Sequence, residues 1–274
     1  MIGERTRVPA EWLDLREPAD AGARDQGLVE HLRRNLTRNG SHVIHDLACG
    51  TGSFGRWLAP LLPGPQRWVL HDLDEGLLDA AAAKPPSRAS DGAPVEVEMR
   101  RTDVTRLQPE DLADATLITA SALLDLLTHE ELDELIDAVG EPRCPVLLSL
   151  SVVGRVELEP ADPLDSLVAS AFNAHQRRST ARGRLLGPDA VEAAGAGFRR
   201  HGARVLIRPT PWRLGAAESQ LASEWLRGWM AAACEQSAEL ASDAPSYARR
   251  RLAQARAGEL DITVGHADLL AIPR

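Results

Sequence analysis

One aspartate and three glycines stand close together in the segment HVIHDLACGTGSFGRWL, residues 42–58. Gly50, Gly52 and Gly55 fit the G-x-G-x-x-G pattern of dinucleotide-binding loops, in which glycine lets the backbone approach a ligand closely. Asp46 does not belong to that pattern, because its carboxylate would repel a pyrophosphate and attract a cationic group. The segment therefore predicts a cofactor loop with two competing occupants, a nicotinamide dinucleotide and a ligand with a cationic end.

Two further aspartates stand at the ends of later apolar segments. Asp72 ends RWVLHD, and Asp103 follows PVEVEMRRT. Ligands of an open parallel sheet bind at the carboxyl ends of its strands, so we expect the three acids to share one edge with residues 119–122. A carboxylate accepts two hydrogen bonds at once, which suits the two hydroxyls of a ribose. Asp72 is the candidate for that role, and Asp74 is the alternative.

Short apolar segments alternate with helical segments along most of the chain. Strands are predicted at 42–47, 67–74, 94–104, 115–122, 145–154, 203–209 and 260–273. Strands that alternate with helices are joined by right-handed crossovers and form a parallel sheet. The fold class is therefore α/β, with a doubly wound, mainly parallel, seven-stranded Rossmann-like sheet.

The helical segments outside this alternation suggest how the chain is organised. Residues 1–40 form an N-terminal helical segment, and Arg16, Asp20 and Arg24 make it a candidate lid over the cofactor. Residues 41–274 form the main domain. Helical insertions predicted at 155–187 and 210–257 would supply a cap.

The loop and the acids resemble those of the class I S-adenosylmethionine-dependent methyltransferases. The first motif of that family, D-x-A-C-G-T-G, is matched by residues 46–52, and the resemblance covers residues 40–150. It implies S-adenosylmethionine as cofactor, with Asp46 facing the methionine amino group, Asp103 accepting from the adenine amine and the Val104 amide donating to the adenine. The expected cofactor-binding residues are Asp46, Ala48, Cys49, Gly50, Gly52, Asp72, Leu73, Asp103, Val104 and Ser121.

Methyl transfer from a sulfonium is an in-line displacement that mainly needs alignment, with a base where the acceptor carries a proton. Asp125 is one candidate base, since it follows the strand at 115–122. His175 is the other, because it continues the apolar helical stripe that ends at Phe172. A histidine packed in the core is the alternative for His175.

Two residues are candidates for contacts with the methyl acceptor. Trp212 is expected in a loop after the strand at 203–209, and Arg178 extends the stripe of His175, although a solvated helix end would explain this arginine equally. The Asn/Asp-Pro-Pro-Tyr/Phe motif of relatives that methylate nucleic acid bases or protein glutamine is replaced by TASA at 119–122. We therefore expect a small-molecule acceptor that is methylated on oxygen or nitrogen.

Composition limits the possible partners and setting. The 274 residues carry 31 basic and 40 acidic side chains, a net charge of −9 that disfavours a nucleic acid partner. Three widely spaced cysteines indicate neither a disulfide framework nor a metal site, and no apolar run suits a membrane span or a signal peptide. A cytoplasmic protein is expected. The sequence sets no oligomeric state.

Two other functions remain open at this point. An NAD(P)-dependent Rossmann oxidoreductase shares the glycine pattern, but a Tyr-x-x-x-Lys pair is absent because the only tyrosine, Tyr247, is far from the only lysine, Lys84. A non-catalytic subunit that only binds the cofactor is the second alternative.

Overall fold

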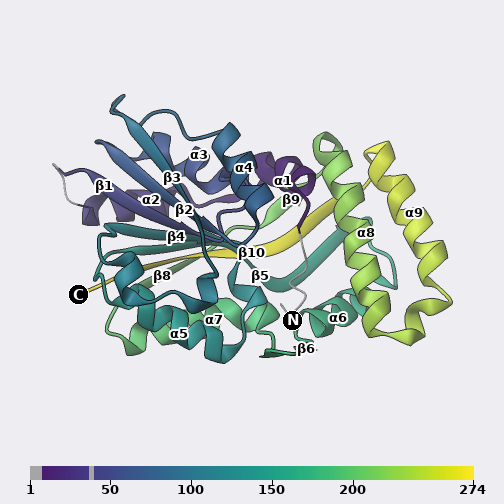
Figure 1. The fold of residues 1–274 in the computed structure, drawn as a ribbon. Coiled ribbons are helices and arrows are strands. Elements are labelled where there is room, and N and C mark those ends of the chain that lie inside the picture. The colour runs from purple at the N-terminus through teal and green to yellow at the C-terminus, as the bar shows by residue number, and fades with distance from the viewer. Residues whose placement is uncertain (1–7, 37–39) are drawn as a thin grey trace.

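A central sheet with helices on both faces makes up one part of the protein, and a helical lobe lies beside it (Figure 1). This computed structural model describes residues 8–36 and 40–274, so residues 1–7 and 37–39 of the predicted N-terminal segment lie outside the described residues. The strands are β1 (His42–Leu47), β2 (Gln66–Asp72), β3 (Val95–Arg101), β4 (Leu117–Ser121), β5 (Val146–Glu159), β6 (Ser179–Thr180), β7 (Gly183–Arg184), β8 (Arg204–Pro209), β9 (Trp212–Leu214) and β10 (Asp261–Ile272).

The main sheet has the order β3-β2-β1-β4-β5-β10-β8. The first five of these strands are parallel, whereas β10 runs antiparallel to both β5 and β8. The short strand β9 adds to β10 beyond the end of β8, and β6 pairs only with β7. The predicted α/β class, with a doubly wound and mainly parallel sheet of seven strands, is confirmed.

Helices bury the two faces of this sheet in separate cores. The helices are α1 (Ala10–Ala23), α2 (Gln26–Asn35), α3 (Ser53–Leu58), α4 (Glu75–Ala83), α5 (His129–Gly140), α6 (Asp165–Gln176), α7 (Ala190–Arg200), α8 (Ser219–Gln236) and α9 (Ala244–Ala257). Apolar side chains of α5 and α7 pack on one face, and those of α2, α3 and α4 pack on the other. The carboxyl ends of β1 and β4 are thereby fixed between two dry layers.

Strands β5 and β10 extend beyond the sheet and carry the helical lobe. They pair from Asp261 opposite Glu159 to Ala271 opposite Val146, and their outer halves share a third core with α1, α6, α8, α9 and β9. The predicted helical insertion at 155–187 is therefore wrong over residues 155–159, which continue β5. The insertion predicted at 210–257 likewise begins with β9 rather than with a helix.

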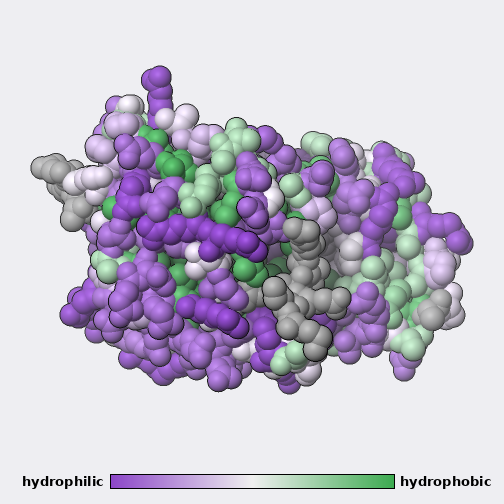
Figure 2. All heavy atoms as spheres, in the orientation of Figure 1, coloured by the Kyte–Doolittle hydropathy of each residue, from purple (hydrophilic) through white to green (hydrophobic). Residues whose placement is uncertain are grey.

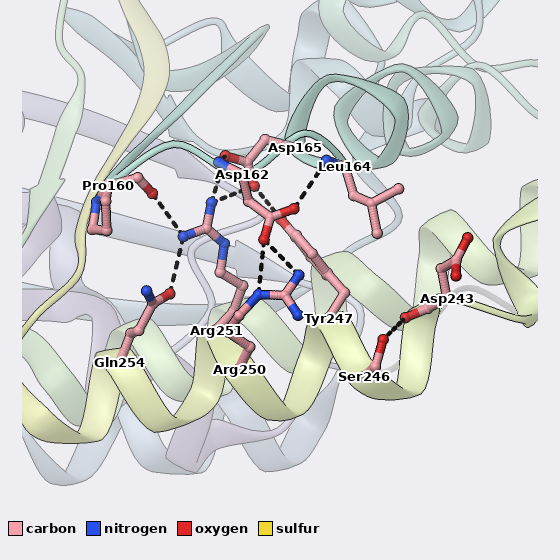
Figure 3. A network of polar contacts seen from close by, with 10 residues as sticks. All are labelled: Pro160, Asp162, Leu164, Asp165, Asp243, Ser246, Tyr247, Arg250, Arg251 and Gln254. Carbon is pink, nitrogen blue, oxygen red and sulfur yellow. Dashed lines mark hydrogen bonds and ion pairs between the residues drawn. The ribbon is translucent and has the colours of Figure 1, made fainter.

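A buried arginine on α9 joins the helical lobe to the start of α6 (Figure 3). The Arg251 guanidinium donates to both carboxylate oxygens of Asp165 and, at 2.7 Å, to the carbonyl of Pro160. The Tyr247 hydroxyl donates to the same Asp165 carboxylate. Arg251 is only 1% exposed, so this charge-assisted network fixes the angle at which α9 packs.

The surface is mostly polar over the sheet part of the face drawn in Figure 2. None of the helices built from the described residues is long and apolar enough to cross a bilayer. Within the same residues, no group of three or more His, Cys, Asp or Glu side chains is arranged to hold a metal ion.

Two buried histidines on neighbouring strands form a chain of hydrogen bonds. His45 Nε2 lies 3.0 Å from Asp114 Oδ1, His45 Nδ1 lies 3.0 Å from His71 Nε2, and His71 Nδ1 lies 3.2 Å from Thr102 Oγ1. Because the Asp114 carboxylate only accepts, neutral His45 donates from Nε2, His71 donates to His45, and Thr102 donates to His71. Burial lowers the pKa of His71 from 6.5 to about 4, so both rings stay neutral at physiological pH.

This histidine pair makes stability depend on pH. Below pH 6.5 the unfolded chain binds a proton at His71 while the folded protein resists protonation down to about pH 4. The free energy of unfolding should therefore decrease as the pH is lowered from 6.5 to about 4, and His71 should account for roughly 1–3 kcal/mol of this decrease. Denaturant titrations at several pH values should show a shallower fall for His71→Gln. The exposed control His129→Gln should lose stability as steeply as wild type. If His71→Gln also loses stability as steeply as these two proteins when the pH is lowered, the prediction is contradicted.

Candidate active site

A pocket opens at the carboxyl ends of β1 and β4, with α1 as one wall. Its lining residues are Leu13, Arg16, Asp20, Asp46, Ala48, Cys49, Gly50, Thr51, Ser53, Phe54, Ser121 and Ala122. The glycine loop between β1 and α3 supplies Ala48, Cys49, Gly50 and Thr51, and the end of β4 with the turn after it supplies Ser121 and Ala122. The pocket thus lies at the strand ends where the sequence places a ligand.

The glycine loop takes a conformation that favours glycine at two positions. Gly50 has a φ of 56°, and Gly52, which has a φ of 77°, begins α3. Asp72 holds this loop from the next strand, because its Oδ2 accepts a 2.9 Å hydrogen bond from the Gly50 amide. Its Oδ1 accepts from the Asp74 amide at 2.9 Å. Asp72 thereby couples the end of β2 to the loop and still has lone pairs to offer.

Asp46 is buried at the base of the pocket with one oxygen unused. Its Oδ1 accepts a 2.7 Å hydrogen bond from the Thr119 hydroxyl, whereas its Oδ2 has no hydrogen-bond partner in the described part of the chain. Burial raises the pKa of Asp46 to about 7. A buried carboxylate oxygen facing a pocket without a donor is the feature that a ligand ammonium group would satisfy.

Backbone strain accompanies the pocket. Ala48 and Ala122 both line it, and they have φ values of 52° and 53°, in the left-handed region that alanine rarely adopts. They follow β1 and β4, where the chain must turn sharply away from the strand. Strained residues of this kind concentrate at functional sites, because the surrounding fold must hold them in place.

Helix α1 is held against the glycine loop and α4 by ion pairs. The Arg56 guanidinium on α3 donates to both oxygens of Glu17, at 2.8 and 2.6 Å, and Lys84 pairs with Asp14 at 2.8 Å. The Leu13 side chain lies next to Gly50, where a Cβ on that glycine would approach it to 3.0 Å. The N-terminal helix therefore closes the pocket in this structure.

Trp212 lies behind this wall and not in a loop, so the predicted loop position is wrong. It belongs to β9 and is 3% exposed, and its Nε1 donates a 3.0 Å hydrogen bond to Asp20. The Arg16 guanidinium lies 4.9 Å from its ring centroid. Since Asp20 and Arg16 stand between Trp212 and the pocket, this tryptophan positions pocket residues without lining the pocket itself.

The predicted cofactor residues divide into two groups along the strand ends. Those in the pocket are Asp46, Ala48, Cys49, Gly50 and Ser121, and those outside it are Gly52, Asp72, Leu73, Asp103 and Val104. Asp103 follows β3, and its Oδ1 accepts from the amide and the hydroxyl of Thr105. The residues of the second group lie at or after the ends of β1, β2 and β3, and these three strands lie on one side of β4 in the sheet.

The predicted acceptor-side residues are not brought together. Asp125 lies in a short turn after β4, and burial raises its pKa to about 6, while the charge of Arg16 acts in the opposite direction. His175 lies on α6 in the helical lobe, where its Nε2 is 3.1 Å from Glu235, and it is not a pocket residue. Arg178 donates to the His175 carbonyl at 3.2 Å at the end of that helix.

Comparison with known proteins gives a family for this arrangement. Residues 44–141 match the family model described as a methyltransferase domain, and this span includes the glycine loop, Asp72, Asp103 and Asp125. Residues 44–141 are therefore similar to a methyltransferase domain, as the sequence prediction of a class I, S-adenosylmethionine-dependent methyltransferase expects. No curated protein matches the chain.

Several solved structures of methyltransferases are similar to this chain at low sequence identity. A methyltransferase from Geobacter sulfurreducens in complex with S-adenosylhomocysteine has 15% identity and a TM-score of 0.47, covering 98% of this chain and 100% of its own. The cyclopropane synthase MmaA2 from Mycobacterium tuberculosis has 13% identity and a TM-score of 0.46, with coverages of 90% and 83%. A phosphoethanolamine N-methyltransferase from Haemonchus contortus has 14% identity and a TM-score of 0.48, with coverages of 98% and 59%.

Several pocket residues were not predicted as site residues. Thr51 lies within the matched motif, and Ser53 and Phe54 follow it directly, so extending the motif into the next helix would have found these two. Leu13 carries no such signal, because only the packing of α1 brings it to Gly50. Ala122 belongs to the segment 119–122 that was expected at this edge, and its strained backbone sets it apart there.

The glycine loop provides a matched test of close approach. Gly50→Ala and Gly92→Ala both place a side chain at positive φ, so each should lower stability by about 1 kcal/mol. Only the Gly50 variant adds a methyl group in the pocket, since Gly92 has open space around it. We predict that calorimetry shows at least a tenfold loss of S-adenosylhomocysteine affinity for Gly50→Ala and none for Gly92→Ala. Equal affinities would refute the role of this loop.

Proposed function

We propose that this methyltransferase transfers the methyl group of S-adenosylmethionine to an oxygen or nitrogen atom of a small-molecule acceptor. The observation that carries the proposal is the pocket beside the glycine loop, in which Asp46 keeps one buried oxygen without a partner among the described residues. The cationic amino group of the methionyl end would donate to that oxygen. A charge-assisted hydrogen bond of this kind is both strong and specific for a cation.

The adenosyl end of the cofactor would extend along the strand ends toward β3. Asp72 would accept hydrogen bonds from the ribose hydroxyls with its remaining lone pairs. Asp103 would accept from the adenine amine, and the Val104 amide would donate to the ring. The bound cofactor supplies a methyl group activated by a sulfonium, and the residues of the loop hold it in line with the acceptor.

Asp125 is the residue we assign as the base for the acceptor proton. It follows β4 beside the wall that Arg16 forms, and its pKa of about 6 keeps it ionised at neutral pH. An ionised carboxylate in a largely dry site can remove a proton from a hydroxyl or an ammonium as the methyl bond forms. We do not include His175 and Arg178 in this assignment, because they lie at the end of α6 in the helical lobe.

The size of the acceptor follows from how the pocket is closed. Helix α1 covers it through the pairs Glu17–Arg56 and Asp14–Lys84, and this cover favours a small acceptor over a macromolecule. We infer that the segment 1–40 acts as a lid on the main domain, residues 41–274, with the helical regions within 155–187 and 210–257 as its cap. The net charge of −9 also disfavours nucleic acid as the acceptor.

Asp46 gives cofactor binding a defined dependence on pH. Its pKa of about 7 means that the ammonium-binding ionised form dominates above pH 7 and is lost below it. The affinity for S-adenosylhomocysteine, measured by calorimetry, should therefore fall as the pH is lowered from 8 to 6. Asp46→Asn should bind on the order of 10- to 100-fold more weakly at pH 8 and should show no such dependence.

The exposed Asp133→Asn is the control for this titration and should behave as wild type. A wild-type affinity that stays constant from pH 8 to 6 would contradict the role of Asp46. Retention of full affinity by Asp46→Asn at pH 8 would contradict it as well.

The variant Asp125→Asn tests whether Asp125 acts on the acceptor proton and not in cofactor binding. We predict unchanged affinity for S-adenosylhomocysteine and a 10²- to 10⁴-fold loss of methyl transfer. The assay uses S-adenosylmethionine labelled in its methyl group and a panel of small hydroxyl and amine acceptors. His175→Gln should keep wild-type turnover, because Glu235 and not the pocket is its neighbour. Full turnover by Asp125→Asn, or a selective loss in His175→Gln, would overturn the assignment.

A further inference from the structure

Arg24 is a buried arginine at the edge of the pocket with most of its donors unused. It is 4% exposed, and its Nη2 lies 3.2 Å from the Ser121 hydroxyl oxygen. Its Nε and Nη1 have no hydrogen-bond partner within residues 8–36 and 40–274. The guanidinium also lies over the rings of Phe54 and Trp57, 4.7 and 5.4 Å from their centroids. Ser121 and Phe54 both line the pocket, so the arginine lies directly behind two lining residues.

The backbone at Arg24 is fixed before any ligand arrives. Arg24 ends α1, and its amide donates to the Asp20 carbonyl at 3.2 Å. The next amide, of Asp25, donates to Asp268 Oδ2 at 3.0 Å, and the Asp25 carboxylate caps α2 through Leu28. The guanidinium is therefore presented from a junction between two helices that is tied to the sheet.

The neighbouring carboxylates do not satisfy this arginine. Asp20, Asp46 and Asp268 attract it electrostatically, but none forms an ion pair with it among the described residues. Asp20 already accepts from Arg16 and Trp212, and Asp268 accepts from several donors of its own. A buried guanidinium without its hydrogen bonds is unfavourable, and burial lowers its pKa accordingly. Such a group is suited to an anion that enters the pocket.

We propose that Arg24 binds the α-carboxylate of the methionyl end of the cofactor. Two groups of opposite sign with atoms that lack a partner among the described residues then lie at the pocket, Asp46 Oδ2 in its lining and the Arg24 guanidinium behind Ser121 and Phe54. The ammonium and the carboxylate of an α-amino acid hang on one carbon, so a single ligand end satisfies both groups together. Two parallel N–H donors match the two oxygens of a carboxylate.

The assignment rests on the proposed function, because it requires that S-adenosylmethionine occupies this pocket. It adds a specificity that the glycine loop does not provide. Ligands that carry adenosine and the amine but lack the carboxylate should be discriminated against, and Arg24 should be the source of that discrimination.

Calorimetric titration with two ligands tests this inference without any turnover. One ligand is S-adenosylhomocysteine, and the other is its decarboxylated analogue, which keeps the adenosine, the sulfur and the amine. Wild type should bind S-adenosylhomocysteine about 10- to 100-fold more tightly than the analogue. Arg24→Met should lose that preference by weakening S-adenosylhomocysteine alone, Arg24→Lys should keep part of it, and the exposed control Arg208→Met should keep all of it.

The outcomes are distinct, provided that the melting temperature of each variant shows it to be folded. Equal weakening of both ligands in Arg24→Met would mean that the arginine only supports the structure, and unchanged affinities would mean that it does not face the ligand. Either result would overturn this assignment and leave the proposed function intact. Failure of wild type to bind either ligand would overturn the proposed function, and this assignment with it. If Arg24→Met does not fold, Arg24→Lys alone must show a reduced preference, and a full preference would refute the proposal.

Discussion

The arrangement of the pocket depends on one buried carboxylate, Asp268 in the middle of β10. Its Oδ1 accepts hydrogen bonds from the Ser149 hydroxyl and the Leu150 amide at 2.8 Å and from the Thr210 hydroxyl at 3.0 Å. Its Oδ2 accepts from the Asp25 amide at 3.0 Å. Asp268 thus joins β5, the connection between β8 and β9, and the junction of α1 with α2. Because these contacts are buried, removing the Asp268 carboxylate would leave these donors without their acceptor inside the sheet.

A second constraint is that Asp46 and Arg24, which carry opposite charges, form no ion pair with each other among the described residues. Asp46 and Arg24 influence each other electrostatically, yet each retains donors or acceptors without a partner among the described residues. Burial raises the pKa of Asp46 and lowers the pKa of Arg24, so both groups are held in an unfavourable setting. Polar atoms kept dry and unpaired are best explained by a ligand that completes them, and a zwitterionic end does so with no rearrangement of the sheet.

The sequence predicted the parts of the site that depend on local order along the chain. The glycine loop, Asp46 and the strand-end acids follow from the motif and from the position of each strand, because a parallel sheet brings those ends together. The outer half of β5 could also have been found, since Val156 and Leu158 alternate with exposed residues. Gly154, at a φ of 74°, interrupted that pattern and hid the continuation of the strand.

What the sequence could not predict depends on packing between distant segments. Leu13 reaches Gly50 only because α1 crosses the loop, and Trp212 is buried only because β9 adds to β10. The unused donors of Arg24 are visible only when every neighbouring acceptor has been placed. The apolar residues from which His175 was predicted do lie on a helix, α6. That helix belongs to the helical lobe, and His175 near its end lies next to Glu235.

Titration of the wild-type protein with S-adenosylhomocysteine and with NADPH tests the central claim most directly. The carboxylate of Asp46 at the base of the pocket should repel the pyrophosphate of a dinucleotide and attract the amino group of the homocysteine. We predict one-to-one calorimetric binding of S-adenosylhomocysteine and no binding of NADPH. Binding of NADPH without binding of S-adenosylhomocysteine would contradict the account and identify a dinucleotide site instead.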